Sequence, residues 1–513
     1  MGSFYLLKIN HVRPMKITCI LLALICICAS CETNRKTIAV KEGLYISDAM
    51  ILTSEDGQYT SFEGHVVVDC GILTYVGNKA PQITGDYEKI EGKGKFLIPG
   101  LIDSHVHIMQ TNGMSYDHIQ KNPELVSKYK EQVPRSYLYY GFTTLINLGG
   151  ITSDYLDWLQ SQPIRPDVYH TGWSGAAVAN GYPMNNTPEQ IRFNVFPNFI
   201  YLESEAENIP EQFTPEDHTA EMVVNRIKES GAIAVKTYYE KGWDKSQPEL
   251  PVPSKSIIQN LHEQANKNGM VLTIHANSYE AHSFVTDAGV DIIAHGLWNW
   301  GLYSNAPKDS LPNAIQQVLD KQIEKQIGYT PTLAVINGLR VLADPDFLET
   351  EELKRTLSKE MIDWYTSEEG QWFAEEIVGQ SSPKEVDSLF ANIQSRGQSA
   401  LKYVSDNGGT ILFGTDTPSA PTYGNQPGFT GYSELVQMNE SGLSLDKILT
   451  SATVNNAKAF HLDSIVGTID VGKRAHLVLL NTNPLKTIEA YNDIHTVIVN
   501  GKAIPREGLS IQN

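Results

Sequence analysis

Residues 97–109 read Leu-Ile-Pro-Gly-Leu-Ile-Asp-Ser-His-Val-His-Ile-Met, and this stretch decides which fold we expect for the chain. Side chains alternate between the two faces of a β-strand, so His105 and His107 point to the same side. Two imidazoles at the end of an apolar strand suit a shared metal ion. Two histidines separated by one residue are also common without a metal, so the prediction of a metal site depends on the residues that follow downstream.

Downstream of this strand, apolar β-rich segments alternate with helical segments. We count eight candidate strands, at residues 101–107, 143–148, 167–172, 232–238, 271–275, 291–295, 328–333 and 410–416. Amphipathic stretches such as residues 221–230 and 254–268 lie between them. Strands that alternate with helices predict a parallel sheet, and eight such units predict an α/β protein with a (β/α)8 TIM-like barrel. Residues 304–407 are too long for one crossover, and their acidic helical part, around 346–380, predicts a lid over the barrel mouth.

Short β-like pieces separated by turn residues occupy both ends of the chain. They occur between residues 37 and 90 and again at residues 466–480 and 496–501. We expect the two ends to complete one β-sandwich module that flanks the barrel. The predicted domains are therefore residues 37–96 and 461–505 for the composite sandwich and residues 97–460 for the barrel.

The N-terminus has the pattern of an export signal. Lys16 precedes an uncharged run at residues 19–28, and Ala29-Ser30-Cys31 follows it. This resembles a bacterial lipoprotein signal that spans residues 1–30 and is cleaved before a lipidated Cys31, although Cys28 stands where such signals usually have Leu. It predicts an exported, membrane-anchored lipoprotein on the periplasmic or cell-surface side; a plain secretory signal, giving a secreted or periplasmic protein, and an N-terminal anchor helix are the alternatives.

Composition limits the partners and the cross-links. The formal net charge of −19 over 513 residues argues against nucleic acid as a partner. After removal of the signal, Cys70 is the one cysteine in the folded body, so an intramolecular disulfide cannot form there. We expect membrane contact only through the lipid at Cys31, and the sequence leaves a homo-oligomer open.

Titratable residues recur where the predicted strands end, which is where reactive groups lie in a (β/α)8 barrel. They are His105, His107, Lys236, His275, His295 and Asp416. Each alone has an ordinary explanation, such as a lysine that pairs with an acid. Together they would be costly to bury without a metal or a counter-charge.

These residues make the chain similar to the amidohydrolase superfamily, in the branch of imidazolonepropionase-like proteins and Xaa-Pro dipeptidases. The resemblance covers roughly residues 37–505. It is carried by residues 99–107, 140–144, 295–296, 413–416 and 467–473, together with Lys236 and His275.

The resemblance implies a binuclear centre, usually with two zinc ions. His105, His107 and Asp416 would hold one ion, and His275 and His295 the other. Lys236 would be carboxylated and would bridge both ions, because a carbamate is an anionic oxygen donor and an ammonium is not.

Catalytic roles are expected for Asp416, Lys236 and His295, with Asp416 moving the proton from the attacking water to the leaving amine. Tyr238 and Tyr239 follow Lys236, and Tyr182 stands in a Gly-Tyr-Pro where relatives often have Gly-His-Pro. We expect these three tyrosines to lie near the substrate.

The sequence therefore predicts a metal-dependent hydrolase of amide or peptide carbon–nitrogen bonds, acting on small peptides or N-acyl amino acids. The alternatives within the superfamily are a cyclic amidohydrolase and a deaminase. Mononuclear deaminases typically place Glu three residues after the strand-five histidine, where this chain has Ser278, and that disfavours deamination. A binding module that merely kept the fold should have lost ligands, and none of the six is missing.

Overall fold

The computed structural model describes residues 36–55, 58–242, 246–307, 310–379, 381–419 and 421–511. The expected signal segment, residues 1–30, and the lipidation site Cys31 lie outside these residues. Among the helices of the described residues, none is both long and apolar enough to cross a membrane.

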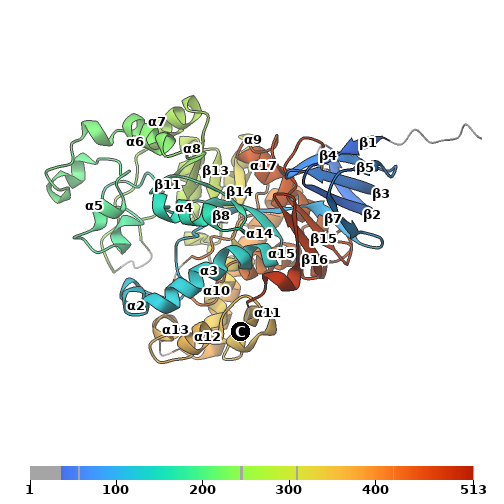
Figure 1. Ribbon diagram of the computed structural model, residues 1–513. Coiled ribbons are helices and arrows are strands. Elements are labelled where there is room, and N and C mark those ends of the chain that lie inside the picture. The colour runs from blue at the N-terminus through green and yellow to red at the C-terminus, as the bar shows by residue number, and fades with distance from the viewer. Residues whose placement is uncertain are drawn as a thin grey trace, which may run out of the picture.

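An eight-stranded sheet at one end of the molecule combines both ends of the chain (Figure 1). Its order is β17-β16-β15-β7-β2-β3-β4, with β6 beside β2. The strands are β2 (Gly43–Glu55), β3 (Gln58–Asp69), β4 (Ile72–Gly77), β6 (Tyr87–Glu91), β7 (Phe96–Pro99), β15 (Leu477–Leu480), β16 (Ile494–Val499) and β17 (Lys502–Pro505).

One core holds the two halves of this sheet together. Leu44 and Ile46 of β2 share it with Leu477 and Leu479 of β15, because alternate residues of each strand face the same side. The hydrogen-bonded strands form one continuous sheet rather than the two sheets of a sandwich, and the ribbon of β1 (Thr37–Ala39) and β5 (Gln82–Thr84) is a separate small sheet. The composite origin of the module is thus as expected, but its strand pairing differs.

Seven parallel strands form the centre of the molecule in two sheets. The first has the order β10-β9-β8 and the second β11-β12-β13-β14. Their bounds are β8 (Leu101–Val106), β9 (Phe142–Asn147), β10 (Asp167–His170), β11 (Ala234–Tyr238), β12 (Val271–His275), β13 (Ile292–Ala294) and β14 (Gly328–Thr330). The N–H of Ile233 donates to the carbonyl of His170, 3.1 Å away, and links the two sheets. Every residue of β8 and β9 is buried, which explains their nearly continuous apolar sequences.

The eighth predicted strand, residues 410–416, is an extended segment rather than a regular strand. Isolated parallel bridges join Ile411 to Tyr329 of β14 and Thr417 to Val106 of β8, so the segment lies between the two sheets. Asp416 has a φ of 59°, in the left-handed region, and a regular strand cannot continue through that conformation. The prediction of eight strands closed into a barrel is therefore confirmed only in part.

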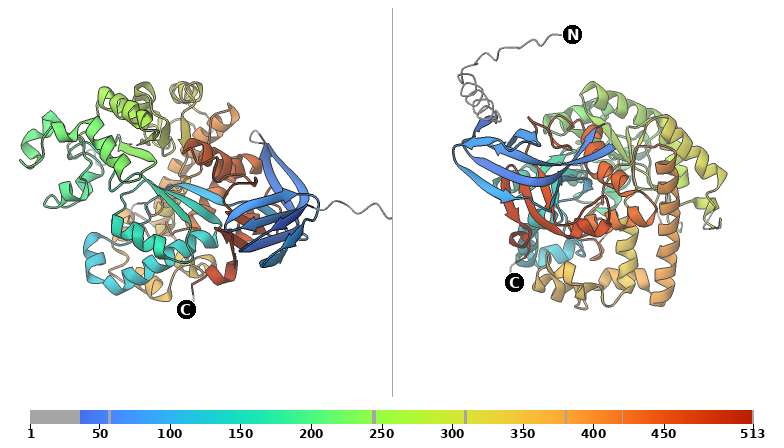
Figure 2. Two further views of the ribbon diagram at one scale, coloured as in Figure 1. Left: turned by 45° about the horizontal axis from the view of Figure 1, so that its top comes forward. Right: turned by 90° about the vertical axis from the view of Figure 1, so that its right-hand side faces the viewer.

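Helices surround the parallel strands, with the sheet module to one side (Figure 2). Several begin at the residue types that cap helices: Thr219, Ser254 and Ser278 each accept a hydrogen bond from the backbone N–H three residues on. The helices are α2 (Tyr116–Lys121), α3 (Pro123–Tyr139), α4 (Ser153–Ser161), α5 (Arg192–Val195), α6 (Ala220–Glu229), α7 (Lys255–Lys267), α8 (Tyr279–Ala288), α9 (Asn313–Glu324), α10 (Leu333–Arg340), α11 (Glu351–Lys354), α12 (Lys359–Tyr365), α13 (Trp372–Val378), α14 (Pro383–Asp406), α15 (Phe429–Glu440), α16 (Leu445–Thr450) and α17 (Asn456–Ala459).

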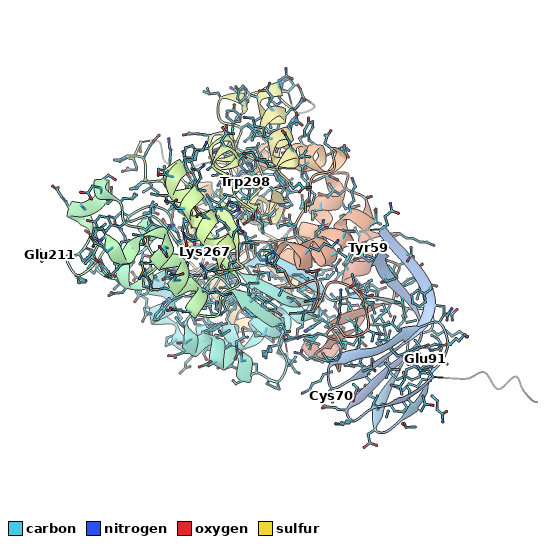
Figure 3. The ribbon with its side chains drawn as sticks, turned by 90° about the horizontal axis from the view of Figure 1, so that it is seen from above. Tyr59, Cys70, Glu91, Glu211, Lys267 and Trp298 are labelled. Atoms are coloured by element: carbon cyan, nitrogen blue, oxygen red, sulfur yellow. The ribbon has the colours of Figure 1, made fainter. Side chains whose placement is uncertain are left out.

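The sheet module contacts the central domain through specific polar bonds as well as apolar packing. Tyr59 of β3 lies where the sheet meets the helices (Figure 3), and its hydroxyl is 2.6 Å from that of Thr453. At the start of β10, the carboxylate of Asp167 accepts hydrogen bonds from Arg474 and His476, which come from the C-terminal part of the chain. These contacts fix the sheet against the end of the strands that lies away from the metal-ligand candidates.

The acidic helical region expected to form a lid acts instead as a support. The hydroxyl of Tyr365, at the end of α12, donates to the carbonyl of Asn112, and the indole of Trp372, in α13, donates to the carbonyl of Gly113. These bonds hold the loop that follows β8. No described residue from α11 to α13 lines the cavity that holds the metal-ligand candidates.

Candidate metal centre

The six predicted ligands come together at the carboxyl ends of the parallel strands. All of them line one cavity of about 400 Å³: His105, His107, Lys236, His275, His295 and Asp416. Parallel strands bring their carboxyl ends to the same edge, so residues separated by up to 311 positions become neighbours.

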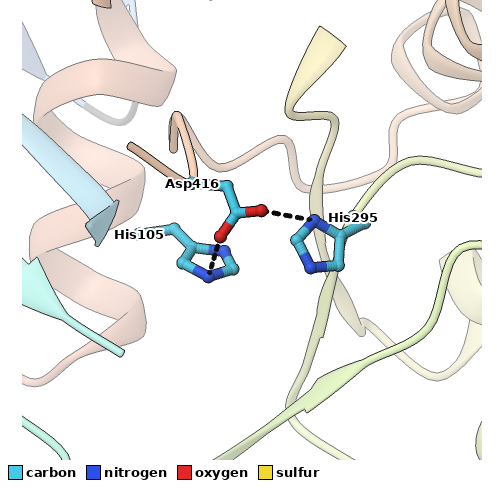
Figure 4. A group of neighbouring side chains, drawn as sticks. All are labelled: His105, His295 and Asp416. Atoms are coloured by element: carbon cyan, nitrogen blue, oxygen red, sulfur yellow. Dashed lines mark ion pairs between the residues drawn. The ribbon is translucent and has the colours of Figure 1, made fainter. Parts of the chain in front are cut away.

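His105, His107 and Asp416 form the tightest group. The Nε2 atoms of the two histidines are 3.3 Å apart, and each lies 2.9 Å from Oδ1 of Asp416. His295 completes the group, with Nδ1 3.8 Å from the other carboxylate oxygen, as Figure 4 shows. The ligand atoms of His105, His295 and Asp416 lie within 4.8 Å of one another, which is close enough to hold one metal ion.

Lys236 and His275 each present a buried nitrogen atom that makes no well-aligned hydrogen bond with the described residues. The Nζ of Lys236 has none among the described residues, and its nearest recorded ring contact is Tyr238, 5.6 Å from Nζ to the centroid. His275 Nε2 lies 3.5 Å from Glu240 but makes no well-aligned hydrogen bond. Its ring centroid is 4.6 Å from that of His295. A buried nitrogen without a hydrogen-bond partner destabilises the folded protein. These two atoms therefore suit a bound group, such as a metal ion, that would interact with them.

Electrostatics favour the protonation states that metal ligands need. Burial lowers the pKa of His105 to about 3, that of Lys236 to about 7, and that of His295 well below its usual value. Burial raises the pKa of Asp416, but His105 and His295 outweigh it and hold that pKa well below its ordinary range. At neutral pH the site therefore presents the neutral imidazoles of His105 and His295 beside a carboxylate.

Asp103 positions two of the ligand-bearing segments, a role that the sequence prediction missed. Its buried carboxylate accepts hydrogen bonds from the backbone N–H groups of His105 and Thr415, both at 3.1 Å, and from the Thr415 hydroxyl at 2.7 Å. It therefore ties the end of β8 to the loop that carries Asp416. Asp103 alternates with His105 and His107 in the opening stretch, and that spacing was the available signal.

Glu240 and Thr332 also contact the ligands. Glu240 follows Lys236 and Tyr238 at intervals of two residues, so alternation could have placed it beside His275. Thr332 Oγ1 lies 3.1 Å from His295 Nδ1, a contact across two strand ends that no local pattern signals. Thr332, His295 and Asp416 all have positive φ, and such strained conformations gather at functional sites.

The three predicted substrate tyrosines separate into two groups. Tyr182 and Tyr238 line the cavity, and the ring centroid of Tyr182 is 4.8 Å from that of His275. Tyr239 lies outside it and packs against Phe284, with ring centroids 4.7 Å apart. Consecutive residues leave a strand on opposite sides, so Tyr238 and Tyr239 cannot both face the substrate, and placing Tyr239 there was wrong.

Comparison with known proteins identifies the family. Residues 96–504 match the model of the Amidohydrolase family, so the chain belongs to that family. As a member, it is an enzyme that hydrolyses carbon–nitrogen bonds. This confirms the resemblance drawn from the sequence.

Solved structures with the same fold include Xaa-Pro dipeptidases. A prolidase in complex with N-methylphosphonate-L-proline has a TM-score of 0.63 and 18% identity, and covers 90% of this chain and 99% of its own. A Xaa-Pro dipeptidase with bound methionine has a TM-score of 0.61 and 20% identity over 90% of this chain and 100% of its own.

Curated relatives match over shorter regions. A 5-methylthioadenosine/S-adenosylhomocysteine deaminase from Moorella thermoacetica is 28% identical over 159 residues, which is 28% of this chain and 36% of the relative. The chain spans between 14% and 36% of the length of the curated relatives that it matches.

Proposed function

We propose that this protein hydrolyses the amide or peptide bond of small peptides or N-acyl amino acids with the help of two divalent metal ions, most simply zinc. The observation that carries the proposal is the convergence of His105, His107 and Asp416 within 3.3 Å of one another, beside His275 and beside the buried Nζ of Lys236, which has no hydrogen-bond partner among the described residues. The structural likeness to prolidases and Xaa-Pro dipeptidases supports the substrate class.

The residues fit a metal pair in the arrangement that the family resemblance implies. His105, His107 and Asp416 would hold one ion, and His275 and His295 the other. The buried Nζ of Lys236, with no partner among the described residues, fits a carbamate that bridges both. Carboxylation needs a neutral amine: Nζ attacks carbon dioxide, an N–C bond forms, and a proton leaves to solvent.

The metal pair would supply Lewis acidity toward the scissile carbonyl and would make an attacking water acidic near neutral pH. Asp416 remains ionised in its surroundings, so its carboxylate can accept the proton that this water loses. The same carboxyl can then return the proton to the nitrogen of the breaking C–N bond, so that an acid and an amine leave. His295 lies 3.8 Å from Asp416 and, kept neutral by burial, can orient the carboxylate.

Deamination is the second candidate, because two matched relatives are deaminases. Ser278 argues against it. Its hydroxyl accepts a hydrogen bond from the N–H of Ala281 and caps α8, so it occupies the place of the deaminase glutamate with a structural role. A cyclic amide would undergo the same bond cleavage and remains the alternative within amide hydrolysis.

Metal analysis combined with a hydrolysis screen tests the proposal. We expect about two divalent ions per chain and turnover of dipeptides, N-acyl amino acids or their derivatives by the zinc-loaded protein. His105→Ala should lower both metal content and turnover. His495→Ala, an exposed histidine on β16, is the matched control and should change neither. Well-folded, active protein without bound metal would refute the proposal.

A further inference from the structure

Outside the six ligands, the described residues that line the cavity carry no charge. Among its described residues, Lys236 is the only Lys or Arg and Asp416 is the only carboxylate. The remaining polar groups are neutral, such as Thr111 and Asn186, and the others are apolar, such as Phe196.

Three charged residues near the wall, Arg192, Glu240 and Lys241, have partners, and the carboxylate of Glu240 lies 3.5 Å from His275 Nε2. Arg192 reaches the cavity-lining Thr187, but its guanidinium donates to the backbone carbonyl of that residue and to the side chain of Asn180. Lys241, three residues beyond Tyr238, pairs with Glu280 at 2.7 Å and with Glu249 at 3.2 Å. Both cations are therefore already paired, and neither of them lines the cavity.

A neutral wall discriminates between substrates by their charge. A free carboxylate that enters a cavity of about 400 Å³ gives up hydration, and among the described residues of the wall it would meet no Lys or Arg other than Lys236. A carboxamide or an acylated nitrogen loses less hydration and can be satisfied by one hydrogen bond.

Thr111 is the residue of the wall that we assign to such a hydrogen bond. It lines the cavity, it is 5% exposed, and its hydroxyl oxygen is buried with no partner among the described residues. A hydroxyl both donates and accepts, so it can bind the N–H or the carbonyl of a neutral group.

We infer that this enzyme prefers amides whose substituents near the scissile bond are uncharged, such as N-acylated peptide amides, over free dipeptides and free N-acyl amino acids. Thr111 is the specificity-determining residue for the neutral group. The inference rests on the proposed amide hydrolysis and narrows its substrate class.

Turnover of matched pairs tests this selectivity. N-benzoylglycine is compared with N-benzoylglycinamide, and a free dipeptide with its N-formyl amide, using zinc-loaded protein. We expect kcat/KM to be at least about tenfold higher for each neutral member, which is a modest desolvation effect for one ionised group. Hydrolysis of both members with a preference for the charged one would overturn the selectivity and leave amide hydrolysis intact.

Binding of metal-chelating probes keeps the test independent of turnover. 4-Carbamoylbenzohydroxamic acid and 4-carboxybenzohydroxamic acid have nearly the same shape and differ in charge, and calorimetry gives both Kd values. We expect the carbamoyl probe to bind at least tenfold more tightly even if no substrate is turned over. Equal affinities, or tighter binding of the carboxyl probe, would overturn the inference.

Two substitutions test the charge and the hydroxyl separately. Asn186→Arg adds a cation at an exposed position of the wall and should shift the Kd ratio several-fold toward the carboxyl probe, whereas Asn186→Gln should not. Thr111→Val should weaken the carbamoyl probe several-fold, and Thr111→Ser should restore it. An unchanged ratio in Asn186→Arg or an unchanged Kd in Thr111→Val would contradict the respective part of the inference.

Discussion

Replacement of Lys236 by methionine should stabilise the metal-free protein while it abolishes metal binding. Methionine has a similar length and can fill the same space without a charge. Lys236 is 1% exposed and its Nζ has no hydrogen-bond partner among the described residues. Burial of this lysine destabilises the metal-free protein, so its presence is better explained by a role as a metal ligand than by a structural role.

The size of the gain follows from the pKa of Lys236. Burial lowers it from 10.5 to about 7. One pKa unit corresponds to ~1.36 kcal/mol, so burial of the protonated amine costs up to about 5 kcal/mol below pH 7. Between pH 7 and 10.5 the unfolded chain binds the extra proton, so the cost falls as pH rises and is up to about 2 kcal/mol at pH 9.

Urea unfolding after treatment with a chelator measures this effect. Lys236→Met is compared with wild type at pH 6 and pH 9, and Lys267→Met, at an exposed position near the end of α7 (Figure 3), is the control. We expect a higher free energy of unfolding for Lys236→Met, with a larger gain at pH 6, and little change for the control. A less stable Lys236→Met variant, or a gain independent of pH, would refute the burial argument.

Four further predictions concern the metals, the bridge, the sheet contact and export. His295→Ala should bind fewer metal ions than wild type, by elemental analysis, and an unchanged count would remove His295 from the ligand set. Lys236→Ala should lose activity and regain part of it with short carboxylic acids, whereas Lys236→Arg should stay inactive because guanidinium remains cationic; an unmodified amine in the density of a fully metallated, active enzyme would exclude the carbamate. Asp167→Asn should lower the free energy of unfolding by about 3 kcal/mol at pH 7. Burial raises the pKa of Asp167, but His476 and Arg474 together hold it below its usual value, so this stability is present above about pH 4 and is lost as pH falls; an equal loss at pH 2 and pH 7 would contradict the ion-pair origin. We propose export and lipidation at Cys31, so Cys31→Ala should release the protein from the membrane fraction, and wild-type protein found in the cytoplasm with residues 1–30 intact would disprove it.

The sequence alone predicted which six titratable residues meet at the cavity and most of the central strands. Two-residue alternation fixes His105 and His107 on one face, and the wholly buried strands β8, β9, β11 and β12 have the apolar sequences that parallel strands require. Local patterns of this kind depend on neighbouring residues, so they can be recognised without knowledge of the rest of the chain.

Only the tertiary structure decided how those elements meet. The sequence suggested a regular eighth strand, yet the backbone turns left-handed at Asp416, whose carboxylate lies 2.9 Å from His105 and from His107. Contacts such as Asp103 with Thr415 join residues 312 positions apart, and the sequence near either one does not specify the other. The neutral wall of the cavity likewise comes from many separate loops. The charge of the wall depends on which side chains the packing of these loops brings together. No single stretch of sequence specifies that combination.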